Sequence, residues 1–184
     1  MATLNTISDH LFDICENAAY SNSTCCILKI IEDEENFKFE IEDNGKGMNK
    51  EQINLALDPF FTTKKERVKK IGVGLPFLKY SSELTGGYFK IDSKKGKGTK
   101  ITCNFKKNHI DCQPIGDLAT TIFSVIYINT EINWKIIRIF KNDEYNIDTK
   151  KLKEIIGDIN KISVMKELKE IIISSENELK EEKK

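Results

Sequence analysis

Three polar residues near the N-terminus recur at helical spacing and could bind a metal ion and phosphate. His10, Asp13 and Asn17 are three and four residues apart, so on a helix they form one polar stripe. An Asn amide oxygen is a hard, neutral ligand suited to Mg²⁺ held between phosphate oxygens. Asp13 could orient or deprotonate an attacking water. The alternative, favoured for an isolated helix, is a stripe that faces solvent.

A carboxylate follows an alternating apolar run and could read a nucleotide base. Asp43 has the same parity as Phe37, Phe39 and Ile41, so it should point to the core face of a strand. A buried carboxylate is costly unless it meets donors, and the exocyclic amine of adenine is such a donor. Its motif, DNGKGM, ends at Met48.

The two glycines of this motif would let the backbone turn and approach a flat base. We therefore add Gly45, Gly47 and Met48 to Asp43 as predicted nucleotide-binding residues. The alternative is a plain Asp-Asn-Gly turn, which is a common hairpin connection.

A second glycine motif, GVGLP, opens a predicted helix. Backbone amides at a helix start can cradle phosphate, and the helix dipole assists them. We predict that phosphate contacts come from Gly72, Val73, Gly74 and Leu75. The spacing fits neither a Walker A loop nor a GxGxxG dinucleotide fingerprint. The alternative is a simple helix N-terminal turn.

Two further residues complete the predicted site. Lys64 begins the basic run 64–70, which precedes the second glycine motif, and it is our first choice for a cation at the terminal phosphate. Such a run is more often a solvated loop. Thr99 alternates with Ile101, Cys103 and Phe105, so its hydroxyl should face inward, toward the base edge or an ordered water.

The helices and strands that must position these residues are predicted from hydrophobic periodicity and from capping, glycine and proline residues. We expect a helix over 4–20, strands over 25–31 and 37–43, and a short helix capped by Asn49 with Gln52. A further helix should begin at Pro76 and stop at Gly86, and strands should follow over 88–92 and 99–105.

The chain changes character near residue 108. The pattern predicts a helix over 115–128, a hairpin over 134–148 and two more helices, with the tail 176–184 a solvated helix end or disordered. We therefore predict two domains, an ATP-binding domain over 1–108 and a small α+β module of unknown role over 109–184.

Composition excludes several classes of protein. Lys plus Arg equals Asp plus Glu at 29 each, which argues against bulk electrostatic binding to nucleic acid. We expect no membrane span, because no stretch approaches the roughly 20 apolar residues it needs. Five cysteines without CxxC spacing favour a reduced, cytoplasmic setting.

The ordered motifs resemble those of the Bergerat-fold (GHKL) ATPases, which include gyrase B, the heat-shock chaperone ATPase, the mismatch-repair ATPase and the sensor histidine kinases. The histidine-kinase ATP-binding domain is most similar. The likeness rests on DPFFTTK, GVGLPFLK and TGGYFKIDSKKGKGTKITCNF and covers about residues 4–106. The HxxDxxEN start also resembles small stand-alone bacterial ATP-binding proteins, some of them associated with iron hydrogenase operons.

The resemblance implies a two-layer α/β (α+β) sandwich, with a mixed sheet on one side and helices on the other. It implies ATP and Mg²⁺ as ligands, with Asn17 on the metal and Asp43 on adenine. Asp13 falls where the hydrolysing members carry a catalytic Glu, and it is one methylene shorter.

Three functions remain open at this point. The first is a kinase that phosphorylates a partner protein, because only three residues precede Leu4 and leave no room for the helical hairpin with the phosphoacceptor histidine. The second is a weak ATPase that acts as a nucleotide-driven switch. The third is a non-catalytic ATP sensor. His10 is a tempting phosphoacceptor, but a structural role for it is favoured.

Overall fold

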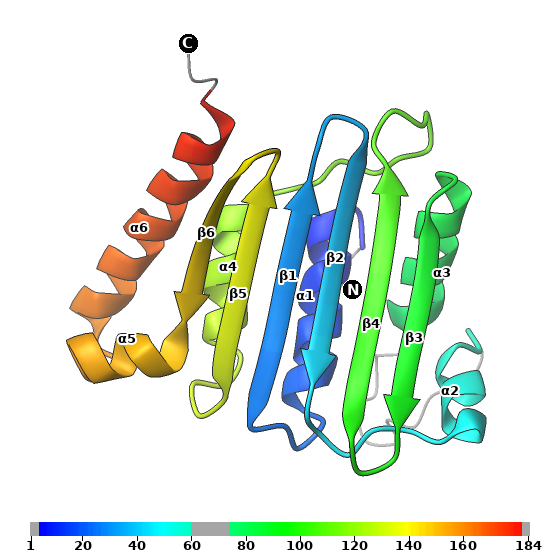
Figure 1. The fold of residues 1–184 in the computed structure, drawn as a ribbon, viewed down its shortest axis with the longest axis horizontal. Helices are drawn as coiled ribbons and strands as arrows, with labels where there is room; N and C mark the ends of the chain where they lie inside the picture. Colours follow the sequence, from blue (N-terminus) through cyan, green and yellow to red (C-terminus); the bar gives the residue numbers. More distant parts are fainter. Residues whose placement is uncertain (1–3, 60–73, 182–184) are drawn as a thin grey trace.

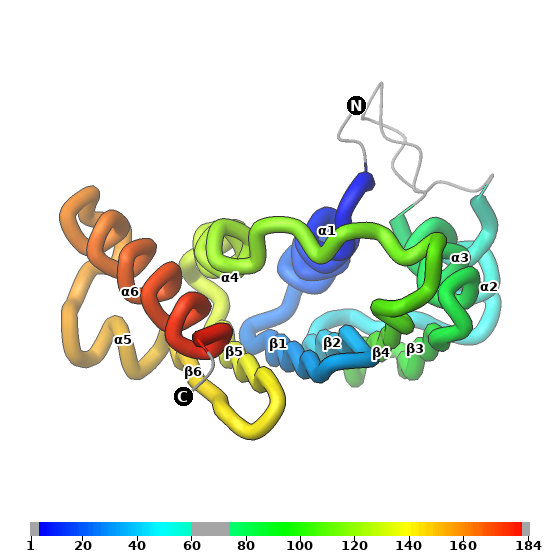
Figure 2. The backbone as a smooth tube through the Cα atoms, turned by 90° about the horizontal axis from the view of Figure 1, so that it is seen from above, coloured from blue at the N-terminus to red at the C-terminus, as the bar shows by residue number. Residues whose placement is uncertain are grey.

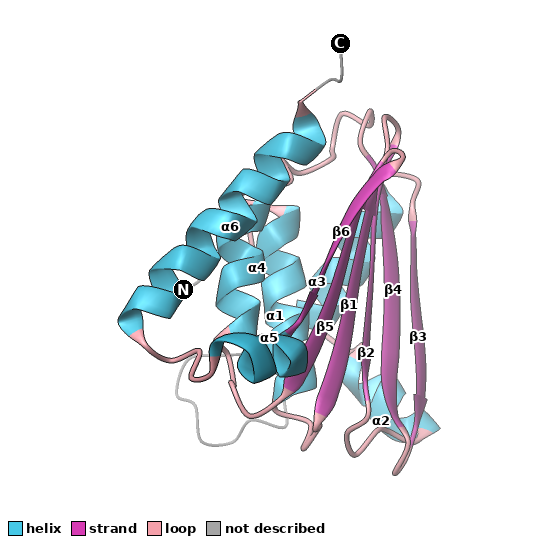
Figure 3. Cartoon of the chain, turned by 60° about the vertical axis from the view of Figure 1, so that its left-hand side comes forward, coloured by secondary structure: helices cyan, strands magenta, loops and turns pink. Residues whose placement is uncertain are grey.

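The protein forms one mixed β-sheet with helices packed on it. The computed structural model describes residues 4–59 and 74–181. The six strands lie in the order β3-β4-β2-β1-β5-β6, and α1, α3, α4 and α6 lie along one face of the sheet (Figures 1, 2 and 3). This is the two-layer α+β sandwich with a mixed sheet that the resemblance implies.

The first half of the chain builds four adjacent strands and three helices. Their bounds are α1 Ile7–Ala19, β1 Cys25–Glu32, β2 Asn36–Asp43, α2 Lys50–Ala56, α3 Gly74–Leu84, β3 Tyr88–Lys94 and β4 Gly98–Lys106. All pairs among these strands are antiparallel. Asn49 caps α2 and Gln52 completes the capping box, as the sequence predicts.

The core lies between the sheet and α1. Side chains alternate along β1 and β2, so Phe37, Phe39 and Ile41 point inward and are almost completely buried. The apolar stripe of α1 meets them, with Ile7, Leu11 and Ile14 at most 1% exposed. This packing fixes how α1 is rotated about its own axis, and with it the direction of the polar stripe.

The helix after the second glycine motif begins earlier than predicted. Gly74 is already helical, and Pro76 lies in the first turn instead of at the first position. Proline is tolerated there because the amides of a first turn have no partner within the helix. The helix ends at Leu84, close to the predicted stop at Gly86.

The second half of the chain continues the same sheet. Its elements are α4 Leu118–Ile126, β5 Asn133–Phe140, β6 Asp143–Asp148, α5 Thr149–Ile156 and α6 Ile162–Lys180. Strand β5 pairs in parallel with β1, from Cys25 opposite Asn133 to Glu32 opposite Phe140.

The sequence predicts a small α+β module over 109–184, and in the structure the strands of this part join the same sheet as those of the first half. Residues of α4 and β5, among them Ile122 and Trp134, are buried in one core with Leu11 of α1. The physical reason is the free edge of β1, since a buried, largely apolar strand needs a partner on each side.

The C-terminal helix also differs from the prediction of a solvated or disordered tail from residue 176. Helix α6 continues to Lys180, and Glu176 and Leu179 are only 3% and 9% exposed. These two residues continue the buried stripe of Leu168 and Ile172. The charged composition of the tail conceals this stripe.

A buried cluster of charges explains why Glu176 is inside. Arg138 of β5 is completely buried and donates to Glu32 at the end of β1 and, over 3.0 Å, to Glu176. Tyr145 of β6 donates to the same Glu176 oxygen over 2.8 Å, and Lys107 pairs with Glu32 at 2.9 Å. Each buried carboxylate thus has a cation as its partner. Without that partner, its burial would be very unfavourable.

Helices in the described residues are too short or too polar to cross a membrane.

Arg138 should therefore be essential for stability. We expect Arg138→Met to lower the free energy of unfolding by about 3–5 kcal/mol, because it leaves the buried Glu176 carboxylate without a cation and leaves Glu32 with Lys107 alone. The matched control is Lys141→Met. Lys141 pairs with the exposed Glu34 at 3.2 Å, and removing this pair should lower the free energy of unfolding by less than about 1 kcal/mol. Urea unfolding measures both, and equal losses would contradict the assignment.

Candidate nucleotide-binding site

Asp43 ends β2 on the core face and is held by donors from three segments. It is 7% exposed. Its Oδ1 accepts the Gly45 amide and the Ser21 hydroxyl, each over 2.8 Å. Burial raises the pKa of the Asp43 carboxyl, and bonds from Gly45, Ser21 and the Thr99 backbone oppose that rise. A carboxylate has about four acceptor positions, so these three donors leave room for a ligand amine.

The loop after Asp43 is fixed by its neighbours on both sides. The Lys46 amide donates to the Ser21 carbonyl over 2.9 Å, and the Lys46 carbonyl accepts the Gly96 amide over 2.7 Å. The Met48 amide donates to Ser93 Oγ over 2.8 Å. Gly47 has a φ of +58°, and a Cβ there would lie 2.1 Å from the Lys94 carbonyl oxygen. This motif is therefore a braced loop and not a two-residue hairpin turn.

Thr99 lies opposite Asp43 in the sheet. The two residues are paired in the β2–β4 register, and Thr99 is also paired with Ser93 of β3. The Thr99 and Ser93 hydroxyls lie 2.8 Å apart. Asp43, Ser93 and Thr99 help line a cavity of about 340 Å³ at this end of the sheet, with Glu42, Asp92, Lys94, Lys97, Gly98 and Lys100.

The proposed metal and catalytic residues meet the start of α3. Asn17 Nδ2 donates to Asp13 Oδ2 over 3.3 Å, so the amide oxygen of Asn17 is turned away from Asp13. A Cβ placed on Gly74 would lie only 1.8 Å from Asp13 Oδ2. The second glycine motif thus contacts the polar stripe of α1 directly, and only glycine permits that approach.

Leu75, the next predicted phosphate-binding residue, is half-buried and packs against the core. Three other predicted site residues, Lys64, Gly72 and Val73, lie outside the described residues. Their roles stay predictions.

His10 has the structural place that we favoured for it. It is 1% exposed, and its Nε2 lies 3.0 Å from the Gln113 side-chain oxygen. Burial lowers the pKa of the His10 imidazole, while Gln113 and Asp9 act in the opposite direction. A buried, neutral ring that bonds to the 112–116 segment is poorly suited to accept a phosphoryl group from solvent.

Sequence reasoning missed two hydroxyls of this site, those of Ser21 and Ser93. Ser93 follows the same inward parity as Phe89 and Ile91 on its strand, a signal that was readable in advance. Ser21 lies in the short SNS segment after α1, and nothing local distinguishes it from an ordinary loop serine.

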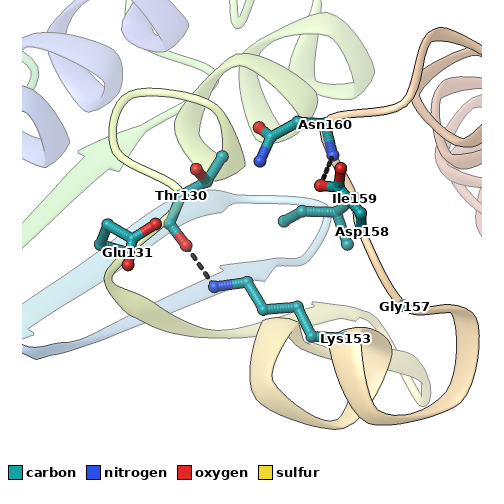
Figure 4. Close-up of a pocket in the computed structure, with 7 residues that line it drawn as sticks. All are labelled: Thr130, Glu131, Lys153, Gly157, Asp158, Ile159 and Asn160. Carbon is teal, nitrogen blue, oxygen red and sulfur yellow. Dashed lines mark hydrogen bonds between the residues drawn. The ribbon is translucent and has the colours of Figure 1, made fainter.

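A second cavity lies near the other edge of the sheet and contains none of the predicted site residues. It measures about 280 Å³ and is lined by Thr130, Glu131, Lys153, Gly157, Asp158, Ile159 and Asn160. Figure 4 shows Lys153 directed at the Thr130 carbonyl, to which it donates. The Lys153 ammonium already has a hydrogen-bond partner. The carboxylates of Glu131 and Asp158 also line this cavity, and their charge disfavours binding of an anion.

A scan against protein families matches residues 4–109, more than half of the chain, to the "Histidine kinase-, DNA gyrase B-, and HSP90-like ATPase" family. The chain belongs to this family, and its ATP-binding domain is of the histidine-kinase type. The match ends within a residue of the predicted boundary at 108, although the sheet continues beyond it.

Curated relatives are bacterial sensor kinases. The circadian input-output histidine kinase CikA of Synechocystis is 34% identical over 112 residues, which is 58% of this chain and 14% of the relative. The CAI-1 autoinducer sensor kinase/phosphatase CqsS of Vibrio cholerae is 28% identical over 134 residues, or 70% of this chain and 18% of the relative. The sensor kinase CckA of Brucella abortus is 43% identical over 61 residues, or 33% and 6%. The chain thus spans less than a fifth of these relatives.

Proposed function

We propose that this protein binds ATP with Mg²⁺ and transfers the γ-phosphoryl group to a partner protein, as the catalytic domain of a histidine kinase does. One observation carries the proposal. Helix α1 connects the two halves of the site, because Asp13, which accepts from Asn17, lies beside Gly74, while Ser21, just past the end of α1, bonds to Asp43.

Asp43 is the proposed reader of adenine. Its carboxylate is buried, is held in place by Gly45 and Ser21, and lies on the wall of the cavity that Thr99 shares. The exocyclic amine of adenine would add a donor to a carboxylate whose charge burial disfavours. A guanine base presents a carbonyl oxygen at that position and would not supply this donor.

Asn17 is the proposed Mg²⁺ ligand. Its amide nitrogen is engaged by Asp13, which leaves the amide oxygen for a hard cation. When bound, Mg²⁺ would neutralise charge on the phosphate oxygens. The amides at the start of α3 would bind the phosphates, with Gly74 and Leu75 in its first turn, and Lys64, Gly72 and Val73 complete the proposed set.

The proposed phosphoacceptor belongs to a partner protein. Among the described residues, His10 is buried against Gln113, and His109 lies in the connection after β4 and accepts the Asp111 amide over 3.2 Å. A nucleophile of the partner would attack the γ-phosphorus, and ADP would leave. The five thiols, all free, support a cytoplasmic location.

The second candidate is an ATPase that works as a nucleotide-driven switch. The observation that favours it is the place of Asp13, whose carboxylate touches both Asn17 and the backbone at Gly74. A carboxylate there could orient a water for attack on the γ-phosphate. Its bond to Asn17 is equally consistent with a role that only positions the metal ligand.

Incubation with γ-labelled ATP and Mg²⁺ tests the proposal. The protein should be used alone and with proteins encoded beside it. Label that appears on a partner supports the kinase, release of free phosphate alone supports the switch, and binding without either supports a non-catalytic ATP sensor.

Asp43→Asn should lose adenine selectivity. The change places a donor where the base amine needs an acceptor, and such a mismatch costs about 1–3 kcal/mol. We expect ADP to bind roughly tenfold or more weakly. Calorimetry on a variant shown to be folded by circular dichroism gives the answer, and normal affinity would exclude Asp43 as the reader of the base.

Asn17→Ala should selectively weaken the binding of nucleotide that carries Mg²⁺. Because the proposed contact runs through Mg²⁺, affinity for MgATP should fall roughly tenfold or more, while affinity for ATP in excess chelator should change little. Calorimetry under the two conditions compares them. An equal loss in both would point to a packing defect and not to a lost metal ligand.

Asp13→Asn separates the two candidate functions. It retains the shape and removes the charge, and a positioned carboxylate base contributes about 10²–10⁴-fold. If the protein is a kinase, transfer of label to a partner histidine should persist, because that nucleophile needs no such base. A collapse of phosphate release with retained ATP binding, and no labelled protein in any condition, would instead establish the switch.

A further inference from the structure

We infer that Ser21 is a positioning residue for the nucleotide base, which sets the orientation and the charge of Asp43 from the end of α1. The inference rests on the proposed function of the Asp43 site and adds a residue to it. Ser21 follows α1 directly after the C-cap Tyr20 and is half-buried.

Ser21 pins one oxygen of the Asp43 carboxylate. Ser21 Oγ and the Gly45 amide both lie 2.8 Å from Asp43 Oδ1. One donor comes from the loop that follows Asp43, and the other comes from a different element, the end of α1. Two donors on a single oxygen fix the rotation of the carboxyl group and therefore the direction in which the other oxygen faces.

Ser21 also sets the position of the loop that carries the base-binding glycines. Its carbonyl accepts the Lys46 amide over 2.9 Å. A Cβ on Gly45 would lie 1.9 Å from Ser21 Oγ and 2.5 Å from the Ser21 carbonyl oxygen. Gly45 is therefore needed because Ser21 packs directly on its Cα, which gives a physical reason for a glycine at that position.

The Ser21 hydroxyl has one proton and two possible acceptors. Its Oγ lies 2.8 Å from the Ala18 carbonyl as well as from Asp43 Oδ1. The Ala18 carbonyl already accepts hydrogen bonds from the Ser23 hydroxyl over 2.8 Å and from the Ser21 amide over 3.2 Å. The Ser21 proton is thus available to Asp43, where a bond to a charged group is worth more.

This bond should also tune the charge of Asp43. Burial raises the pKa of the Asp43 carboxyl, and the Ser21 bond is one of the contacts that lower it. Glu42 on its own strand is the charged group that raises this pKa further. On the paired strand, burial raises the pKa of the Cys26 thiol to about 11, so that thiol stays uncharged, and α1 and β4 present the uncharged Ser21 and Thr99. Loss of the Ser21 donor should therefore raise the pKa further, and a protonated Asp43 can no longer accept from the base.

Calorimetric titration with Mg²⁺ and ADP from about pH 5 to about pH 8 tests the inference. We expect Ser21→Ala to bind roughly tenfold more weakly at neutral pH. As the pH falls, we expect the affinity of this variant to be lost at a higher pH than that of the wild type. Ser21→Thr retains the hydroxyl and should restore both properties.

The chain offers a matched control in Ser23→Ala. Ser23 Oγ donates to the same Ala18 carbonyl and contacts Cys26 Sγ at 3.3 Å, but it does not bond to Asp43. Its removal should change neither the affinity nor the pH profile. If Ser21→Ala does not fold, Ser21→Cys, with a weaker donor of similar size, should shift both properties in the same direction by a smaller amount.

A wild-type affinity and pH profile in Ser21→Ala would overturn the inference, and so would equal changes in Ser21→Ala and Ser23→Ala. The Asp43 carboxyl can also be titrated by NMR in the nucleotide-free protein, where Ser21→Ala should raise its pKa. This second measurement does not depend on the proposed function, which fails separately if the wild type does not bind ADP.

Discussion

The burial of α1 on the inner face of the sheet is the constraint from which the rest of the site follows. The packing of Ile7, Leu11 and Ile14 in the core beneath the sheet fixes the rotation of α1 about its axis. That rotation places Asp13, with its partner Asn17, against Gly74 and brings Ser21, which follows the C-cap, to Asp43. The polar groups of the site are thus aligned by apolar packing that none of them takes part in.

Local signals in the sequence predicted most of the first half of the molecule. Alternation placed Asp43 on the core face, and the capping pair Asn49 and Gln52 marked the start of α2. Both signals depend on residues a few positions apart. Ser21 could not be found this way, because its partner Asp43 is 22 residues distant and a lone serine after a helix has no pattern.

The second half shows the limit of the same reasoning. The elements after residue 115 were predicted close to their observed bounds, but their partners were not. Periodicity shows which face of β5 is apolar without showing that it pairs with β1, 108 residues earlier at Cys25 and Asn133. Glu176 was misread for a related reason, since a charged tail looks solvated until Arg138 is known to lie beneath it.

The parallel pairing of β1 with β5 has a consequence for how the chain acquires its structure. The β1–β2 hairpin closes over only a few residues, from Glu32 to Phe37, so it can form early. The other edge of β1 stays without its partner until more than a hundred further residues have been synthesised. Such distant contacts slow folding, and an apolar strand with an open edge invites pairing with other chains. We therefore expect the yield of folded protein to depend on how quickly the last third of the polypeptide follows the first.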